Sequence, residues 1–338
     1  HLGVETPAAT GRFSLRGGAC ERAERALGRF DGAPATPTVD GRPTTQDAAL
    51  QAAAALLRAS RQPLFAGLGT DVDGARALYP LACATGAITD SAGGEPLIQG
   101  LRALQDRGQF TTTLAEVRTR ADVIVFVGGL PTAMAPLIAA RCGIVDSQLA
   151  QRHVVMLGGG AEDETTLAGW AGPGVSVESI TLTGDLFDTM ALLAALTAQR
   201  RLPDAPPALA ALAQRLHQAR YGVLVGAPPR LPAQGALIIE AVHRIVDQLN
   251  RKARAAALWI GGGNGAATAN QVFAWLSGLP VRSRAGPHGL EHEPHAFDAN
   301  RLLNGAAVDA LLWVSSFDAD AAPPATALPL VVLGHPAQ

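Results

Sequence analysis

The chain has 338 residues, of which 48% are hydrophobic, 4% aromatic and 17% charged. Its 27 basic and 29 acidic side chains nearly balance, so it has neither the positive charge nor the aromatic surfaces of a nucleic-acid-binding protein. No apolar stretch is long enough to cross a membrane, and the first residues lack the pattern of a signal peptide. We therefore expect a cytoplasmic, globular, two-domain protein that binds neither nucleic acid nor membrane.

The first third of the chain alternates helices and strands. An amphipathic stretch from Cys20 to Phe30 predicts a helix, and a linker rich in Pro, Gly and Thr follows at 31–45. Thr45 can cap the N-terminus of an alanine-rich helix that reaches Leu57. Further elements are expected as a strand at 63–67, a helix at 73–84 and a short strand at 87–90 that ends in Asp90.

The alternation continues to the end of the chain. The run of Val and Ile at 122–127 is typical of a parallel strand that is buried on both faces. A second linker is expected at 202–209. Other predicted strands are 153–157, 175–182, 221–225, 255–260, 308–314 and 329–333, with helices at about 185–200 and 236–250. This order predicts an α/β fold of layered, mainly parallel sheets.

Several sites can be proposed from residue types alone. Gly261 to Gly265 follow a predicted strand with the spacing Gly-x-Gly-x-x-Ala, which could hold phosphate at a helix N-terminus or simply meet a backbone requirement. Two glutamates and three histidines between Pro287 and His295 could bind zinc, although the prolines and glycine favour a solvated loop. The candidate metal ligands are His288, His292 and His295, and we expect no bound metal. Cys20, Cys83 and Cys142 are far apart in sequence and predict reduced, buried thiols.

Residues 109–136 contain the most specific pattern. Thr113-Leu-Ala-Glu-Val117 and Arg120-Ala-Asp122 precede a buried apolar run, which ends in Gly129-Leu130-Pro131. The segment resembles the Thr-Leu-Gly-Glu-Val, Arg-Ala-Asp and Gly-x-Asn-Pro series of the B subunits of formylmethanofuran dehydrogenases and their bacterial counterparts in formyltransferase/hydrolase complexes. Further matches at 246–250, 270–272, 275, 278, 280, 308–312 and 316–318 extend the resemblance over roughly Cys20 to Gly334.

The dehydrogenase subunits carry a molybdopterin or tungstopterin and an iron–sulfur cluster, and the residues for both differ here. A cubane cluster needs four thiolates, but the chain has three cysteines at the wrong spacing. After Asp90, where the family has Cys-His-Gly-Pro, the sequence reads Ser-Ala-Gly-Gly-Glu-Pro and includes Gly94. No thiolate therefore stands where the family binds molybdenum or tungsten.

Three further departures remove polar groups. Leu130 replaces the family's Asn between Gly129 and Pro131. The Asp-x-Arg expected after strand 153–157 has become three glycines around Gly159, and the Arg-Gly-His-Tyr-Asn loop has become a glycine-rich turn that includes Gly263 and Asn264. The resemblance thus implies a lost cofactor. The residues of the vestigial pocket would be Asp90, Gly94, Gly129, Pro131, Gly159, Gly263 and Asn264.

The resemblance implies two Rossmann-like layered domains, one inserted in the other, as in the central part of molybdopterin oxidoreductases. We expect an N-terminal remnant and linker at 1–40, a discontinuous domain at 41–115 plus 205–338, and an insert at 116–204. The implied function is a non-catalytic subunit without a cofactor, in a complex that passes a formyl group from tetrahydromethanopterin to a methanofuran-type carrier and releases formate. Its partners would be the A hydrolase, C and D formyltransferase subunits. The alternatives are an active, pterin-binding dehydrogenase subunit and an independent metal-dependent hydrolase that uses the His288–His295 segment.

Overall fold

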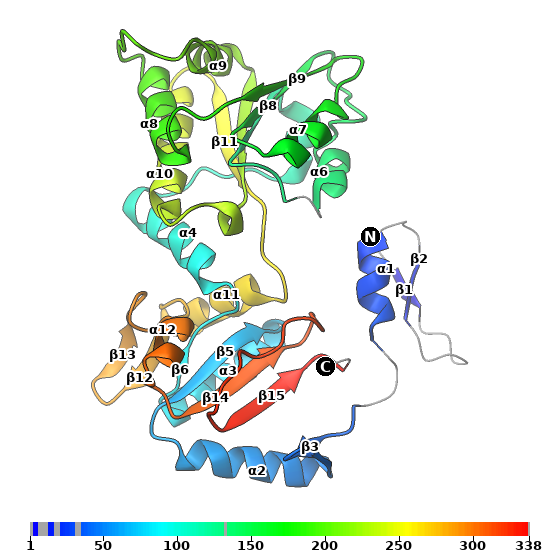
Figure 1. The fold of residues 1–338 in the computed structure, drawn as a ribbon, viewed down its shortest axis with the longest axis vertical. Coiled ribbons are helices and arrows are strands. Elements are labelled where there is room, and N and C mark those ends of the chain that lie inside the picture. Colours follow the sequence, from blue (N-terminus) through cyan, green and yellow to red (C-terminus); the bar gives the residue numbers. More distant parts are fainter. Residues whose placement is uncertain (1–2, 6–12, 17–20, 31–34, 132–133, 337–338) are drawn as a thin grey trace. The chain divides into compact units, whose positions relative to one another are not determined.

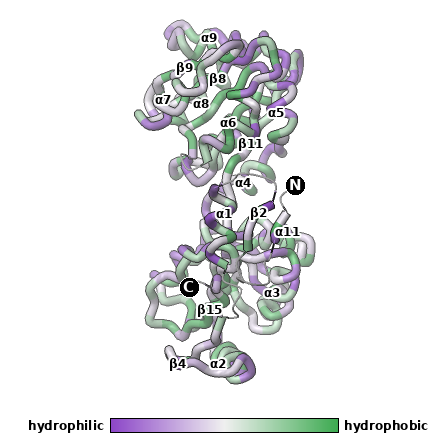
Figure 2. Tube along the Cα trace, turned by 90° about the vertical axis from the view of Figure 1, so that its right-hand side faces the viewer, coloured by the Kyte–Doolittle hydropathy of each residue, from purple (hydrophilic) through white to green (hydrophobic). Residues whose placement is uncertain are grey.

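The structure is a computed structural model that describes residues 3–5, 13–16, 21–30, 35–131 and 134–336 (Figure 1). The chain packs as two compact units. Unit 1 comprises His1–Gly94 and Gly262–Gln338, and unit 2 comprises Glu95–Gly261. Hydrophobic segments lie inside each unit, and hydrophilic ones follow its outer loops (Figure 2). Because the chain leaves unit 1 once and returns once, unit 2 is an insert within unit 1.

Unit 1 is built on a six-stranded sheet with the order β13-β12-β6-β5-β14-β15. Its strands are β5 (Pro63–Gly69), β6 (Ile88–Thr89), β12 (Ser283–Gly286), β13 (Gly289–His292), β14 (Ala310–Ser315) and β15 (Leu330–Gly334). The four strands from β6 to β15 are parallel, whereas β12 is antiparallel to both of its neighbours. The centre of the sheet is therefore β5, a strand that is buried along its whole length.

Unit 1 has five α-helices among its described residues. They are α1 (Glu21–Gly28), α2 (Gln46–Ala59), α3 (Val72–Thr85), α11 (Ala266–Ser277) and α12 (Ala299–Asn304). Helices α3 and α11 pack against each other and against β5, and Leu302 of α12 packs with Leu64 and Leu311 of the sheet. Two small hairpins, β1 (Gly3–Glu5) with β2 (Ser14–Arg16) and β3 (Thr38–Val39) with β4 (Arg42–Pro43), complete the described part of the unit. Thr45 caps α2 as predicted, because its side chain accepts from the Ala48 amide.

Unit 2 is built on a parallel five-stranded sheet with the order β11-β10-β7-β8-β9. Its strands are β7 (Val123–Val127), β8 (Arg152–Leu157), β9 (Val175–Ile180), β10 (Tyr221–Gly226) and β11 (Arg254–Trp259). The residues of β7 alternate between two cores, because successive side chains of a strand point to opposite faces. The apolar run at 122–127 therefore forms the doubly buried strand that was predicted.

Unit 2 has seven α-helices among its described residues, and six of them cover the two faces of its sheet. They are α4 (Gly94–Arg107, which begins at the last residue of unit 1), α5 (Leu114–Arg120), α6 (Ala135–Cys142), α7 (Ala161–Ala168), α8 (Leu186–Thr197), α9 (Pro207–Gln218) and α10 (Gly235–Leu249). One core contains residues of α8, α9 and α10, and the other contains residues of α5, α6 and α7. The predicted α/β fold with layered, mainly parallel sheets is confirmed.

The division between the units differs from the expected boundaries. The insert was expected at 116–204, whereas the structure groups residues 95–261 in one unit. The physical reason is strand pairing, since β10 pairs with β7 in register Gly222 with Val123, and β11 pairs with β10. The strands at 221–226 and 254–259 therefore complete the sheet of the insert.

The segment around the histidines also differs from expectation. It was predicted to be a loop, but residues 283–292 form the antiparallel hairpin β12–β13. Pro287 and His288 make its two-residue turn, and Gly289 follows with a φ of 118° that favours glycine. The sequence showed prolines and glycine, which mark a turn, but not the pairing partner.

Candidate functional site at the strand ends

In open α/β sheets, ligands bind beyond the carboxyl ends of the strands, where the strand order reverses direction. The strand order places this point between β5 and β14 in unit 1 and between β7 and β10 in unit 2. The predicted pocket residues follow strands or begin helices near these ends. Asp90, Gly94, Gly263 and Asn264 belong to unit 1, and Gly129, Pro131 and Gly159 belong to unit 2.

Asn264 closes the crevice between β5 and β14. Its Nδ2 donates to Ser315 Oγ at 2.9 Å, and its Oδ1 accepts from the Phe317 amide at 2.9 Å. A Cβ atom on Gly69, at the end of β5, would lie 2.4 Å from the Asn264 side chain. Asn264 has a φ of 50°, a conformation that asparagine adopts more readily than most residues. Its amide is therefore hydrogen-bonded to the end of β14 and packs closely against the end of β5.

Asp90 lies in a buried ion-pair cluster at the end of β6. Its Oδ1 accepts from the Ser91 amide at 2.9 Å and from Arg282 Nε at 3.3 Å, and its Oδ2 accepts from the Ala299 amide at 2.9 Å. Arg282 Nη2 also donates to Asp298 Oδ2 at 2.6 Å. Burial raises the pKa of Asp90 to about 6, although the Arg282 charge opposes this rise.

Gly94 fits against this cluster only because it lacks a side chain. A Cβ atom there would lie 2.3 Å from Asp90 Oδ1 and 3.3 Å from Arg282 Nη2. Ser91, which directly follows Asp90, is buried, and its Oγ has no hydrogen-bond partner among the described residues. A serine hydroxyl beside a carboxylate and a guanidinium is not the thiolate ligand that a pterin-bound metal requires. The residues present therefore do not fit the family's metal centre.

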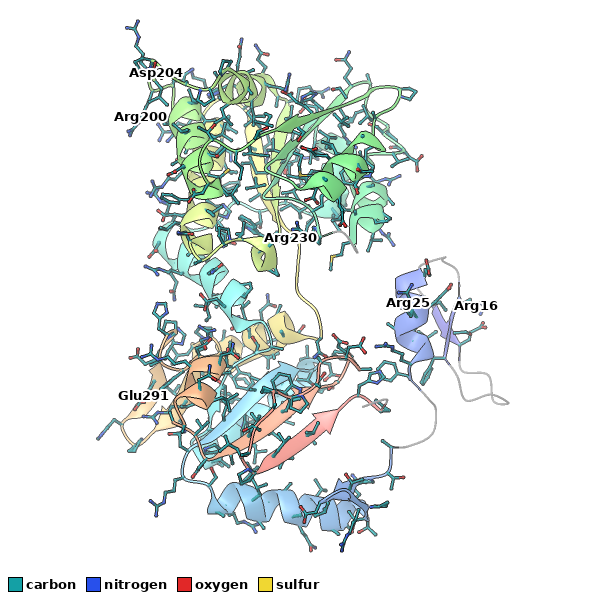
Figure 3. The ribbon with its side chains drawn as sticks, viewed as in Figure 1. Arg16, Arg25, Arg200, Asp204, Arg230 and Glu291 are labelled. Carbon is teal, nitrogen blue, oxygen red and sulfur yellow. The ribbon has the colours of Figure 1, made fainter. Side chains whose placement is uncertain are left out.

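In unit 2, Asp163 of α7 holds the strand ends. Its Oδ1 accepts from the Leu130 amide and its Oδ2 from the Gly160 amide, both at 3.0 Å. Arg230, labelled in Figure 3, reaches Asp163 Oδ2 at 3.4 Å from the short 3₁₀ turn after β10. A carboxylate thus lies at the end of β8 although the strand itself ends in glycines.

The two glycines predicted for this site contact Asp163. A Cβ atom on Gly129 would lie 2.8 Å from Asp163 Oδ2, and one on Gly159 would lie 2.9 Å from Asp163 Cβ. Gly129 also has a φ of 93°, which favours glycine. Pro131 lies between β7 and α6, and its carbonyl accepts from the Met134 amide at 2.7 Å. Whether the seven residues line one inherited pocket stays a prediction.

The glycine-rich turn before α11 meets backbone requirements. A Cβ atom on Gly265 would lie 2.2 Å from the Thr70 carbonyl oxygen, and Gly265 has a φ of 74°. A Cβ atom on Gly261 would lie 3.3 Å from Pro229 Cδ. Close packing accounts for Gly261 and Gly265 without a phosphate, and a φ of 83° favours glycine at Gly262, whereas a Cβ atom on Gly263 would meet no atom within 4 Å.

The three candidate histidines are spread along the hairpin. His288 lies in its turn, His292 ends β13, and His295 is exposed beyond it. Four residues of extended strand span about 13 Å, which keeps His288 away from His292. His292 Nδ1 lies 3.0 Å from the Arg282 carbonyl and 3.2 Å from Ser283 Oγ. No three His, Cys, Asp or Glu side chains gather as a metal site in the described part of the chain.

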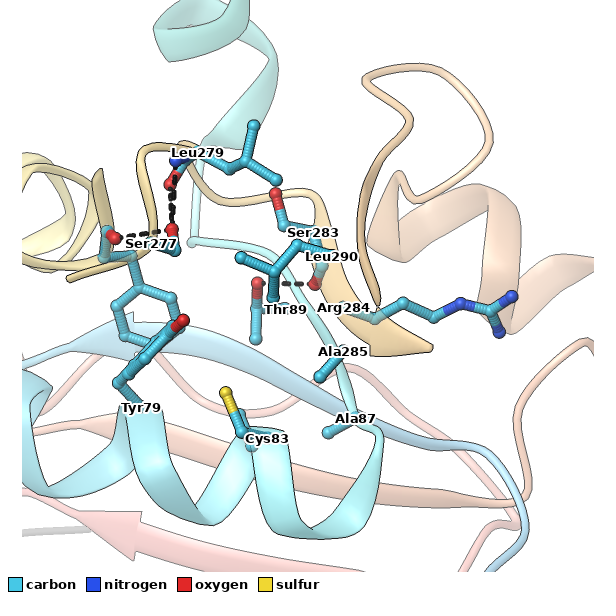
Figure 4. A pocket seen from close by; sticks show the side chains of 12 residues that line it. Tyr79, Cys83, Ala87, Thr89, Ser277, Leu279, Ser283, Arg284, Ala285 and Leu290 are labelled. Atoms are coloured by element: carbon cyan, nitrogen blue, oxygen red, sulfur yellow. Dashed lines mark hydrogen bonds between the residues drawn. The ribbon is translucent and has the colours of Figure 1, made fainter. Parts of the chain in front are cut away.

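The described cysteines lie in different units. Cys83 faces a small apolar pocket of unit 1 beside Tyr79 and Leu290 (Figure 4). Cys142 is buried in unit 2, and burial raises the pKa of its thiol to about 11. Cys20 falls outside the described residues. The two described thiols therefore provide no set of ligands for a cluster.

Sequence reasoning found Asp90 and Asn264 but missed their partners. Arg282 and Asp298 are 192 and 208 residues beyond Asp90, and no local pattern links them to it. Asp163 had a detectable signal, because a carboxylate three residues after Gly160 matches the acidic position of a capping box.

Fold and strand ends together define an α/β protein of two Rossmann-like layered units, one inserted in the other, whose strand ends are occupied by its own polar side chains. No protein-family model matches the chain. The B subunit of the formyltransferase/hydrolase complex Fhc of Methylorubrum extorquens is 34% identical over 284 residues, which are 83% of this chain and 75% of that protein. The chain belongs to the family of this Fhc B subunit.

A solved structure supports the same relationship. The crystal structure of the formyltransferase/hydrolase complex FhcABCD from Methylorubrum extorquens, in complex with methylofuran, contains a chain that matches with a TM-score of 0.76 and 32% identity. The match covers 88% of this chain and 81% of that chain. The similarity therefore extends through both units.

Proposed function

We propose that this chain is the structural B subunit of a formyltransferase/hydrolase complex, with no redox centre of its own and no part in the complex's formyl transfer and hydrolysis. The complex would pass a formyl group from tetrahydromethanopterin to a methanofuran-type carrier and release formate. The A subunit would carry out the hydrolysis and the D subunit the formyl transfer, with C completing the assembly. The observation that supports this proposal most strongly is the 34% identity to an Fhc B subunit over 83% of the chain. We place the complex in the cytoplasm.

The strand ends support a role without a redox centre. Folds of this kind bind ligands at the carboxyl ends of the strands. In this chain, ion pairs within each unit occupy those positions: Asp90 with Arg282 in unit 1, and Asp163 with Arg230 in unit 2. The serine, alanine and glycines after Asp90 supply no thiolate. An active, pterin-binding subunit would need these positions free.

The surface of each unit supports a role in assembly. In unit 1, Trp275 of α11 is 68% exposed, and the edge strand β15 exposes Leu330, Val332 and Leu333. In unit 2, Val145 and Phe110 are also exposed. Exposed apolar groups and an uncovered hydrophobic edge strand are typical of surfaces that a partner covers. None of the helices in the described ranges is long and apolar enough to cross a membrane.

Co-expression tests the proposal. The chain would be produced alone and together with the A, C and D subunits from the same host, and each preparation analysed by size-exclusion chromatography and elemental analysis. We expect the chain to be poorly soluble alone, to co-elute with A, and to bury more than about 1,000 Å² against its partners. A soluble monomer with no affinity for A would contradict the assembly role. Stoichiometric molybdenum, tungsten or iron in the purified complex, retained by this chain, would contradict the absence of a redox centre.

A further inference from the structure

Three polar side chains form a connected row at the edge of the sheet in unit 2. His153 of β8 lies opposite Ser176 of β9 in the strand register, and Glu178 follows two residues later on the same face. His153 Nδ1 lies 2.5 Å from Ser176 Oγ, and His153 Nε2 lies 3.1 Å from Glu178 Oε2. Arg215 of α9 donates to the same Glu178 oxygen at 2.7 Å. A hydroxyl, an imidazole and a carboxylate are thus joined in series.

The protonation of this row follows from its partners. Ionised Glu178 can only accept hydrogen bonds, so it fixes the imidazole proton of His153 on Nε2. Nδ1 then carries the lone pair and faces Ser176 Oγ as an acceptor at 2.5 Å, which is shorter than the 3.4 Å from the same hydroxyl to the Arg152 carbonyl oxygen. Partial burial lowers the pKa of His153, despite the hydrogen bond to Glu178, so the imidazole is neutral at pH 7. This is the arrangement of a nucleophile, a general base and an orienting carboxylate.

The row opens into a hollow of about 530 Å³ whose lining is about equally polar and apolar. Ser176 is exposed, and His153, Arg215, Gln151 and Gln218 line the same hollow. The side chains of Gln151, Gln218 and Arg215 bring N–H donors to the walls of the hollow into which Ser176 opens. Asp122, also on the wall, accepts from the Arg220 and Tyr221 amides and is already engaged. The hollow lies at the amino ends of β8 and β9, away from the strand ends described above.

We propose that this hollow is an acyl-transfer site, at which Ser176 is acylated by carboxylic esters that have a good leaving group. Ser176 Oγ forms the bond to the acyl carbon while its proton passes to His153 Nδ1. The bond from the acyl carbon to the leaving oxygen breaks, and that oxygen takes the proton from His153. Water then repeats the sequence on the acyl-serine, releases the acid and restores the Ser176 hydroxyl. Glu178, held by Arg215, orients the imidazole and stabilises its charged form.

Covalent labelling tests this proposal on the full chain. A fluorophosphonate probe loses fluoride when a serine with an activating base attacks phosphorus, and the adduct is located by mass spectrometry of the digested protein. We expect one adduct on the peptide that contains Ser176. Ser176→Ala should abolish it, and His153→Gln should slow its formation at least about 100-fold, the usual contribution of a general base. Glu178→Gln should slow it less.

Ser179 provides a matched control on the same strand. Its hydroxyl lies on the other face of β9 and donates to Glu164 Oε1 at 3.2 Å, without a histidine. Ser179→Ala should therefore leave the adduct and its rate unchanged. The labelling rate should decline at acidic pH with a midpoint below 6.5, the ordinary pKa of histidine, because burial lowers the pKa of His153. Thermal unfolding of each variant separates a lost site from a lost fold.

The result that overturns the proposal is a wild-type chain that forms no adduct, or an adduct that persists in folded Ser176→Ala. Hydrolysis of p-nitrophenyl acetate gives a second readout, which should be lost in the same variants. Binding to the A subunit depends on neither assay, so a failed acylation test leaves the assembly role of the chain intact.

Discussion

Among the described residues, each unit buries one arginine, and the two arginines are held mainly by different kinds of partner, although Arg282 also donates to the Pro294 carbonyl. Arg282 in unit 1 lies between the carboxylates of Asp90 and Asp298. Arg152 in unit 2 instead donates to backbone carbonyls, those of Val117, Arg118, Ala121, Cys142 and Gly143. Both side chains are almost completely inaccessible to solvent. Carboxylates neutralise the first charge, whereas carbonyl dipoles solvate the second.

The carbonyls around Arg152 come from the C-terminal ends of two helices. Val117, Arg118 and Ala121 end α5, and Cys142 and Gly143 end α6. The last carbonyls of a helix lack intrahelical partners and carry its negative dipole, so a cation is stabilised there. Burial nevertheless lowers the pKa of Arg152. We conclude that unit 1 depends on the opposite charges around its arginine, and unit 2 on the number and geometry of its donors.

The largest expected effect comes from removing the charge in unit 1. Arg282→Met leaves Asp90 and Asp298 without their cation, and we expect a loss of about 3 to 5 kcal/mol in the free energy of unfolding, as for other broken buried pairs. Urea denaturation at pH 7 measures it. Arg284→Met, at a half-exposed ion pair with Glu291 on the same hairpin, is the control and should cost about 1 kcal/mol or less. Equal losses of unfolding free energy in the two variants would contradict the prediction that the buried cluster contributes more to stability than an exposed ion pair.

The next largest effect tests whether the number and geometry of the hydrogen-bond donors of Arg152 stabilise unit 2. Arg152→Lys keeps the charge but offers three donors in place of five, so some helix-end carbonyls remain unsatisfied. Each unsatisfied buried group costs about 1 to 3 kcal/mol, and we expect a total loss of at least about 2 kcal/mol. Hydrogen exchange of α5 and α6 should report the change locally. Unchanged stability in this variant would show that charge alone holds Arg152.

A pH series tests the buried carboxylate itself. The pKa of Asp90 is about 6 in the folded chain, above its ordinary value of 3.8. The folded state therefore binds a proton that the unfolded state lacks between these values, and this contribution to stability grows as the pH falls from above 6 towards 4. Relative to Asp90→Asn, the wild-type chain should gain up to about 3 kcal/mol over that range. A pH-independent difference between the two chains would contradict this.

The smallest effect is expected at the strand ends of unit 2. Arg230 is 40% exposed, and its distance to Asp163 is 3.4 Å, so the ion pair is partly solvated. Arg230→Met should cost less than about 1 kcal/mol. Asp163→Ala should cost more, because the Leu130 and Gly160 amides lose their acceptor. If Arg230→Met were as costly as Arg282→Met, the contrast between buried and exposed pairs would fail.

The sequence by itself determined most of the local structure. The cap at Thr45 was readable because a capping side chain bonds to an amide three residues away. The apolar runs of β5, β7 and β10 were readable because a strand buried on both faces needs such residues at successive positions. Asp90 and Asn264 were named as site candidates because the family resemblance places them in the former cofactor pocket.

Only the tertiary structure decided how these pieces combine. β10 joins β7 although 93 residues separate the end of one from the start of the other, so the boundaries of the insert could not be read from the linkers. Arg282 meets Asp90 across 192 residues, and Asp163 reaches the Leu130 amide across 33. A capping hydrogen bond or an apolar strand is specified by neighbours within a few residues. Strand order and buried ion pairs depend on which distant surfaces are brought together, because the burial that stabilises them arises only when the sheet is complete.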